Sequence, residues 1–241
     1  MNRLEGKVVL VVGGAQGIGR ATVELCVERG AQVIIADIDA AEGEKTAAAL
    51  KTIFHAVDVV DEVSVRSLFE KIEQRYGKLD ALVQTAGVLR GPYVPIETFD
   101  VAMFRSVLEI NVVGSFLCAK HAMPLLKRSG RGVIVLVSSG ASVQGSSSYA
   151  YGTSKGGVDA LGVTLAAKHE ADNIRVNVVR PGNISTAMKR SVIAADAERR
   201  GEDFNTLVNE AGLGEPIGVG QLLAWLASPE ADYVRGVIHT R

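Results

Sequence analysis

The stretch VVLVVGGAQGIGR, residues 8–20, decides the fold of this chain. Its five leading apolar residues are typical of a strand that is buried on both faces. The glycines that follow allow a tight turn and a close approach of the backbone to a pyrophosphate, and a helix starting there would direct unpaired N–H groups at that phosphate. Glycine also serves plain strand–helix turns, but the position after a first strand favours a nucleotide loop. The predicted loop residues are Gly13, Gln16, Gly17, Ile18 and Gly19.

Beyond this stretch, short β-branched apolar runs alternate with helical stretches. The alternation predicts an α/β fold with a single doubly wound parallel sheet and helices on both faces, which is a Rossmann-like architecture. No linker or internal repeat interrupts the pattern, so residues 1–241 are predicted to form one dinucleotide-binding and catalytic domain, with the irregular segment 187–214 as a substrate flap. The expected strands are residues 7–12, 32–36, 53–57, 81–85, 133–138, 175–179 and 237–239, and the expected helices are 18–29, 41–51, 62–76, 101–127, 149–171 and 218–227.

Composition excludes several classes of function. The formal net charge is −1, so the chain offers no broad basic field for nucleic acid or for an anionic membrane. Cys26 and Cys118 are expected to be buried reduced thiols, and four scattered histidines do not make a metal site. The N-terminal residues lack the pattern of a signal peptide, and the apolar runs are shorter than a membrane span. A cytoplasmic protein without metal is therefore expected.

An acid at the end of the second expected strand, QVIIAD, bears on the choice of cofactor. Asp37 lies near the ~20-residue spacing expected of a ribose-binding carboxylate. Such a carboxylate accepts hydrogen bonds from both ribose hydroxyls and repels the additional phosphate of NADP. The neighbouring Ile38 and Gln16 supply no cation for that phosphate, although Arg20 could reach it. Asp37 could instead cap a helix, but Asp39 suits that role better. NAD is the predicted cofactor, and NADP is disfavoured.

Two further positions could contact the adenosine. Asp58, at the end of the third expected strand, could bond the adenine amino group or cap the helix that follows, and Asp61 is also well placed for that cap. Ala86 and Gly87 follow the fourth expected strand, where small residues would let the backbone approach the ribose. A plain turn explains the same pair.

The run Tyr151-Gly-Thr-Ser-Lys155 carries the chemistry. A spacing of four puts both side chains on one helix face. A nearby ammonium favours phenolate and lowers the pKa of a tyrosine, so the pair could give a proton to a ketone oxygen or take one from an alcohol. Taken alone, this spacing is common and is usually structural.

Polar residues elsewhere could complete such a site. Ser138 and Ser139 end the fifth expected strand, where a hydroxyl could polarise a carbonyl or simply cap a turn. No histidine is placed to activate either serine, so nucleophilic catalysis is disfavoured. Asn111 lies in an apolar helix, where its amide would need partners as a structural bond or as part of a proton relay.

Together these residues resemble the short-chain dehydrogenase/reductase family from Gly6 to about Ile238. By this resemblance, Tyr151 is the acid/base, Lys155 lowers its pKa and holds the nicotinamide ribose, the serine orients the carbonyl and Asn111 fixes a water. The matching motifs are the loop glycines 13, 17 and 19, the adenine pair Asp58-Val59, Ala86-Gly87, the tetrad Asn111, serine, Tyr151 and Lys155, and the nicotinamide segment with Pro181, Gly182, Ile184 and Thr186.

The chain departs from the family pattern at four places. Val12 stands where threonine is usual, and Gln84-Thr85 replaces two asparagines, which alters a structural hydrogen bond near the central strand. The loop before Tyr151 is one residue short, so counting from the strand selects Ser139 and counting back from Tyr151 selects Ser138. Ser139 is preferred because strand register shifts less readily than a loop shortens. The sequence ends at GVIHTR, where the family usually continues through Asp-Gly-Gly.

These observations predict an NAD-dependent oxidoreductase that acts on a secondary alcohol or ketone. A non-catalytic NAD(H)-binding sensor and a dehydratase or epimerase are the alternatives. A homo-oligomer, dimer or tetramer, is expected from the resemblance, with no nucleic-acid or membrane partner. The substrate itself is not specified, but loop residues could line a partly apolar pocket. They are Leu89, Tyr93, Val143, Gln144, Met188 and Val192.

Overall fold

A seven-stranded parallel sheet organises the molecule. The computed structural model describes residues 3–240. The strands lie in the order β3-β2-β1-β4-β5-β6-β7, so the chain reverses direction across the sheet between β1 and β4. This arrangement confirms the predicted doubly wound sheet. The strands are β1 (Val8–Val12), β2 (Gln32–Asp37), β3 (Ile53–Ala56), β4 (Ala81–Gln84), β5 (Val133–Val137), β6 (Arg175–Arg180) and β7 (Gly236–His239).

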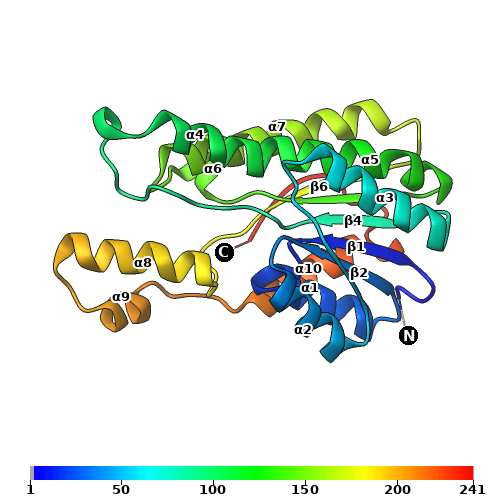
Figure 1. Cartoon of the computed structure of the whole chain (residues 1–241), viewed down its shortest axis with the longest axis horizontal. Coiled ribbons are helices and arrows are strands. Elements are labelled where there is room, and N and C mark those ends of the chain that lie inside the picture. Colours follow the sequence, from blue (N-terminus) through cyan, green and yellow to red (C-terminus); the bar gives the residue numbers. More distant parts are fainter. Residues whose placement is uncertain (1–2, 241) are drawn as a thin grey trace.

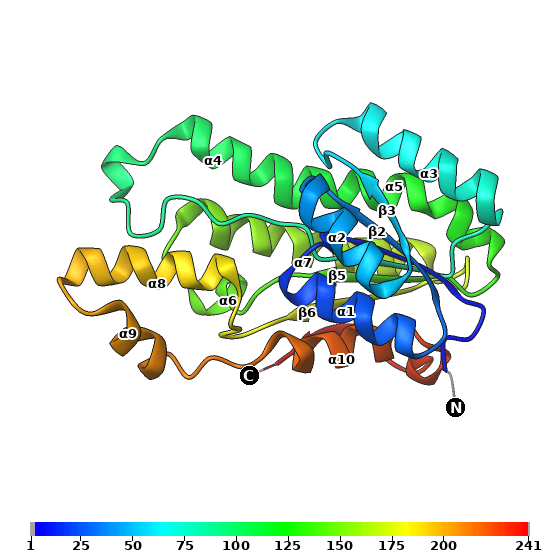
Figure 2. The same ribbon diagram turned by 60° about the horizontal axis from the view of Figure 1, so that its bottom comes forward.

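Helices cover both faces of the sheet, as Figures 1 and 2 show. One face packs on α3, α5 and α7 through a core that includes Leu68, Leu126 and Val158, and the other packs on α1 and α10 through Val23 and Leu223. The helices are α1 (Gly17–Glu28), α2 (Ala40–Leu50), α3 (Glu62–Tyr76), α4 (Val101–Leu108), α5 (Gly114–Arg128), α6 (Ala141–Gln144), α7 (Tyr149–His169), α8 (Ala187–Arg200), α9 (Phe204–Glu210) and α10 (Pro216–Leu226).

The expected helix over residues 101–127 is not α-helical throughout. A π-helical turn, η2 (Glu109–Val113), joins α4 to α5, and the three elements form one continuous helical run. By length and composition this run, Val101–Arg128, could cross a membrane, which differs from the expectation that no apolar stretch is long enough; core helices of soluble proteins pass the same test. In this fold the run packs against α3, α7 and β4.

The sequence suggested that the segment 187–214 is irregular. In the structure, it folds into α8 and α9. Thr186 caps α8 by accepting a hydrogen bond from Lys189 N–H, and Gly201 ends it at φ 66°. Asp203 caps α9 in the same way. The two helices share a small core of Ile193, Ala197 and Leu207. The charged residues of the segment, most of which lie on α8, obscure this pattern. The pair projects from the carboxyl ends of the strands (Figure 1).

Candidate active site

One large cavity lies where the strands end at their carboxyl termini. Its volume is about 850 Å³. Ligands of open α/β sheets bind at this edge, next to the point where the strand order reverses. Every residue predicted for the cofactor or for catalysis lines the cavity, with the exception of Asn111. The structure therefore brings the predicted site residues, which lie far apart in the sequence, together at one edge of the sheet.

The glycine loop fits a dinucleotide phosphate. A Cβ atom on Gly13 would lie 2.5 Å from Ala86 N, and one on Gly19 would lie 2.0 Å from Gly13 O. Gly13 also adopts a φ of 81°, which favours glycine. The glycines therefore let the loop pack closely against the end of β4 and against the first turn of α1. This packing sets the N-terminus of α1 at the cavity, where its backbone N–H groups could bind a pyrophosphate.

Asp37 is held at the end of β2 with its carboxylate in the cavity lining. Ala15 N–H donates to Asp37 Oδ2 at 3.0 Å, and Asp39 N–H donates to Asp37 Oδ1 at 3.1 Å. Asp39 caps α2, as expected. Arg20 pairs with Glu24 at 3.0 Å. The carboxylate is thus oriented by backbone groups and still borders the space where a ribose would lie.

The adenine end is similarly arranged. Asp61 caps α3 by accepting from Val63 N–H, so Asp58 is not the helix cap. Asp58 instead lines the cavity and accepts from Val60 N–H at 3.1 Å. At the end of β4, Thr85 Oγ1 donates to the carbonyl oxygens of Val12 and Gly13 at 2.7 and 3.0 Å.

The altered pair after β4 has a structural consequence. Thr85 joins β4 to the glycine loop through its hydroxyl, which links two neighbouring strand ends. The side-chain amide of Gln84 is buried, and neither its nitrogen nor its oxygen finds a hydrogen-bond partner within residues 3–240. Of the two residues that replace the asparagines, Thr85 therefore makes side-chain hydrogen bonds and Gln84 makes none within the described part of the chain.

Helix α7 presents Tyr151 and Lys155 to the cavity. Ser148 caps the helix by accepting from Tyr151 N–H, and its hydroxyl also donates to Arg90 O at 2.6 Å. Lys155 Nζ donates to Val137 O at 2.8 Å and lies 5.6 Å from the centroid of the Tyr151 ring. The spacing of four therefore places both groups at the end of β5, as predicted.

Burial governs the acidity of this pair. It raises the pKa of Tyr151, and a side-chain hydrogen bond with Ser139 opposes that shift. Burial also lowers the pKa of Lys155 to about 8, opposed by the carboxylate of Asp159. The sequence led us to expect a lowered pKa for Tyr151, but burial, the largest influence, raises it in this structure. The raised pKa keeps the phenol of Tyr151 protonated near neutral pH.

The two serines after β5 have different surroundings. Ser138 is buried, and its hydroxyl donates to Lys155 O at 3.0 Å. Ser139 is partly exposed in the cavity and makes the side-chain hydrogen bond with Tyr151. Of the two, Ser139 has the hydroxyl that a substrate oxygen beside Tyr151 would meet.

Asn111 lies behind the cavity in the π-helical turn η2. Its amide nitrogen donates to Val88 O at 2.9 Å and to Ser154 Oγ at 2.8 Å, and its Oδ1 accepts from Val88 N–H at 2.8 Å. The side chain therefore ties the α4–α5 run to the loop after β4 and to α7. Helical π turns are frequent at functional sites. Gly87 separates Asn111 from Lys155, because a Cβ there would lie 3.2 Å from both side chains.

The flap, residues 187–214, forms the wall of the cavity opposite the glycine loop. Ile184 and Gly214 form an isolated parallel bridge that joins the two ends of the α8–α9 segment. At the far end of α8, the guanidinium carbon of Arg199 lies 4.8 Å from the centroid of the Tyr93 ring. Thr186 stands beside Gly17, so the flap begins at the glycine loop and reaches the loop after β4.

Most of the suggested pocket residues line the cavity, but Val143 does not, since its side chain on α6 is 57% exposed. Sequence reasoning missed Arg90 and Lys189, two cations of the lining. They lie on loops or at a helix start, where no periodic pattern marks the direction of a side chain. Their proximity to Leu89 and Met188 was the available signal.

The fold and this cavity define a dinucleotide-binding oxidoreductase of the Rossmann type. Comparison with known proteins identifies the family: the model of the short chain dehydrogenases matches residues 7–197, and the chain belongs to that family. A cis-4-hydroxycyclohexanecarboxylate dehydrogenase of Sinomonas cyclohexanicum is 39% identical over 96% of this chain and 93% of its own. A (+)-borneol dehydrogenase of Salvia officinalis is 37% identical over 98% and 92%. The crystal structure of levodione reductase superposes with a TM-score of 0.91 at 27% identity, covering 98% of this chain and 96% of its own.

Proposed function

We propose that this protein is an NAD-dependent dehydrogenase or reductase that interconverts a secondary alcohol and a ketone, with Tyr151 as acid and base. The observation that carries the proposal is the grouping of Tyr151, Lys155 and Ser139 in the cavity that the glycine loop also lines. Family membership supports an oxidoreductase acting on an alcohol.

The roles of the side chains follow from their surroundings. Ser139 and Tyr151 line the same cavity and Ser139 is near enough to lower the pKa of Tyr151, so a carbonyl oxygen that reaches both hydroxyls would accept from both. Tyr151 gives its proton to that oxygen in reduction and receives the alcohol proton in oxidation. Lys155, whose charge is retained below about pH 8, stabilises the phenolate that remains after the proton has left. Asn111 positions α7 through Ser154.

The residues present fit NAD. The glycine loop of Gly13, Gly17 and Gly19 would hold the pyrophosphate, Asp37 the adenosine ribose, and Asp58 the adenine. Ile184 and Thr186 would meet the nicotinamide, which supplies hydride transfer when it is bound. NADP is disfavoured because Asp37 would repel a 2′-phosphate and Arg20 is paired with Glu24.

The relatives guide the substrate class. Hydroxycyclohexanecarboxylate, borneol and fucose in their printed names are cyclic compounds that carry hydroxyl groups. The lining of the cavity that holds Tyr151 includes the apolar Leu89, Met188 and Val192. A secondary alcohol on a ring is the substrate that we propose for this chain. A single domain covering residues 1–241, a homo-oligomeric state and a cytoplasmic location are further parts of the proposal.

The test is a screen of the purified protein with NAD against ring alcohols, sugars, polyols, steroids and hydroxy acids. Appearance of NADH absorbance with a ring alcohol, and recovery of the ketone, is the expected result. Tight NADH binding without turnover across the panel would overturn the proposal in favour of a sensor. A changed product without net NADH would indicate a dehydratase or epimerase.

A further inference from the structure

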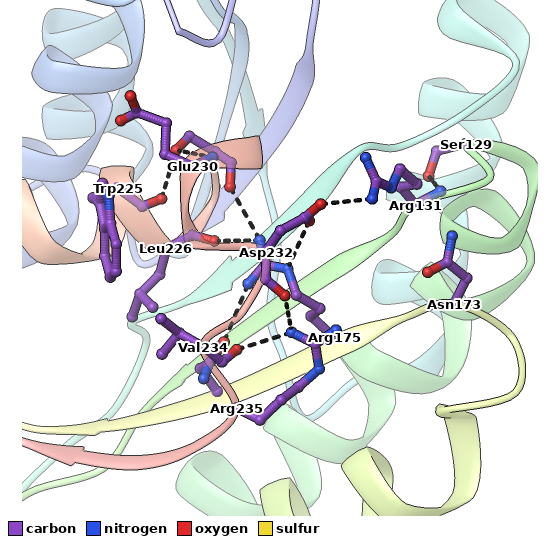
Figure 3. Close-up of polar contacts among 12 residues, drawn as sticks. Ser129, Arg131, Asn173, Arg175, Trp225, Leu226, Glu230, Asp232, Val234 and Arg235 are labelled. Carbon is purple, nitrogen blue, oxygen red and sulfur yellow. Dashed lines mark hydrogen bonds and ion pairs between the residues drawn. The ribbon is translucent and has the colours of Figure 1, made fainter.

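A cluster of arginines lies at the edge of the sheet opposite the active site. Three adjacent parallel strands carry an arginine at or just before their amino ends: Arg131 before β5, Arg175 as the first residue of β6, and Arg235 before β7. Parallel strands begin at the same edge of a sheet, so the topology brings the three guanidinium groups together. They surround Asp232, as Figure 3 shows.

The Asp232 carboxylate contacts two of the three cations, and the third bonds to backbone carbonyls beside it. Arg131 Nη2 lies 2.6 Å from Asp232 Oδ2, and Arg175 Nε lies 3.6 Å from Asp232 Oδ1. Arg235 Nη1 donates to the backbone carbonyls of Asp232 and Val234. The cluster therefore holds two positive charges in excess of its acid.

The cluster encloses a cavity of about 250 Å³. Arg175 forms its floor: its side chain is 4% exposed and is fixed by the carbonyls of Leu226 and Ser228 at 2.9 and 3.1 Å. The pKa of Arg175 is lowered by burial and by repulsion from Arg235 and Arg131. Such repulsion between like charges is relieved when an anion lies among them.

Donors remain for such a ligand. A guanidinium carries five N–H groups. Arg131 contacts Asp232 through one nitrogen, and its side chain is 67% exposed at the rim. Arg235 uses Nη1 for the two carbonyls, which leaves Nε and Nη2. Arginine forks of this kind match the oxygens of phosphate.

We propose that this cluster, Arg131, Arg175 and Arg235 around Asp232, is a binding site for a phosphate-type dianion, either inorganic phosphate or a phosphomonoester. The excess of two charges matches a dianion, and the cavity has room for a phosphate group. The site is separate from the dinucleotide cavity, since the two share no lining residue.

The experiment measures the thermal unfolding midpoint of the NADH-loaded protein against inorganic phosphate, with glycerol 2-phosphate in a second arm and chloride or acetate at matched ionic strength as references. Saturating NADH keeps phosphate away from the glycine loop. The midpoint should rise saturably with phosphate and not with the references. If only the phosphomonoester acts, the organic ester is the ligand; if inorganic phosphate acts as well, the phosphate group suffices.

Variants locate the site. Arg131→Gln and Arg235→Gln should each raise the apparent Kd of phosphate by about tenfold, because each removes charge-assisted hydrogen bonds. Asp232→Asn should lower it, because the competing carboxylate is lost. Arg66→Gln, which removes an exposed arginine paired with Glu70 on α3, is the matched control and should leave the Kd unchanged. No saturable rise in the wild type, or equal Kd values in wild type, Arg131→Gln and Arg235→Gln, would overturn the proposal.

Discussion

The glycine loop and the α8–α9 flap form opposite walls of one cavity, yet they are held in different ways. The loop is part of the sheet: Gly13 N–H donates to Ala36 O at 2.7 Å, and its Cα lies against the backbone of Ala86. The flap is fastened mainly at its base, where Ser185 N–H donates to Gly214 O at 2.8 Å. Its own core is a cluster of three buried apolar residues.

Under the proposed function, this difference separates cofactor binding from substrate binding. A cofactor wall built from strand ends cannot move without disturbing the central sheet. A substrate wall attached at its ends can change in shape and composition while the sheet stays intact. Cofactor binding should therefore be sensitive to single atoms in the loop, while changes in the flap should alter substrate binding and little else.

Between the two walls, the larger effect is expected from the loop. Gly19→Ala would place a Cβ 2.0 Å from Gly13 O, so the backbone donors that face the pyrophosphate must shift. Loss of two such hydrogen bonds costs about 3 kcal/mol, or a roughly hundredfold weaker Kd for NADH. Fluorescence titration of NADH checks this value. Gly156→Ala on α7, where a Cβ meets nothing within 4 Å, is the control and should bind normally. An unchanged Kd for Gly19→Ala would break the comparison.

The choice of cofactor should depend on Asp37. Asp37→Ala removes the acceptors for the ribose hydroxyls and the repulsion of a 2′-phosphate, so the preference for NAD over NADP should fall by about tenfold or more. Calorimetric Kd values for both cofactors measure it. Asp39→Ala, which removes the cap of α2, should destabilise the helix without changing the preference. Tighter binding of NADP than NAD by the wild type would contradict this account of Asp37.

The pH dependence should follow Lys155. Its pKa is lowered to about 8, so its positive charge is present below that pH and is lost above it. Ketone reduction needs this charge and the protonated Tyr151, so kcat/KM should be level at neutral pH and fall above about pH 8. In Asp159→Asn, the carboxylate that raises the pKa of Lys155 is gone, and the break should move to lower pH. A break that stays in place would show that another group controls the profile.

The smallest effect is expected at the flap. Arg199→Ala removes the contact with the Tyr93 ring, which is worth about 0.5–1 kcal/mol at an exposed site. KM for the alcohol should rise by roughly two- to fivefold, while the Kd of NADH and the unfolding midpoint stay near wild-type values. Arg200→Ala, next to it and paired with Asp196 and Glu202, is the matched control. If Arg199→Ala weakens NADH binding instead, the flap is coupled to the cofactor wall.

The same division explains what could be predicted from the sequence. Features that depend on spacing along a single element could be predicted. They are the strand after residue 7, the loop glycines, the acid at position 37 and the pair Tyr151/Lys155. The doubly wound parallel sheet followed from alternation, since parallel strands with helical crossovers allow few arrangements.

The remaining features depend on packing between distant elements. The π turn at Asn111 forms where an amide must reach Val88 and Ser154 at once, and local propensity carries no sign of it. The helices of the flap were not predicted, because the charged residues of this segment obscure its apolar spacing. The raised pKa of Tyr151 comes from burial, which depends on every element that covers the cavity.

The central claim, that Tyr151 is the acid and base of an NAD-dependent alcohol oxidation, is tested most directly by Tyr151→Phe. This change removes one hydroxyl and keeps the ring in the lining of the cavity. The account predicts that kcat/KM for the best alcohol of the panel falls by about 10²–10⁴-fold, while the Kd of NADH stays within about threefold of wild type. Turnover by Tyr151→Phe within a few-fold of the wild-type rate would contradict the account.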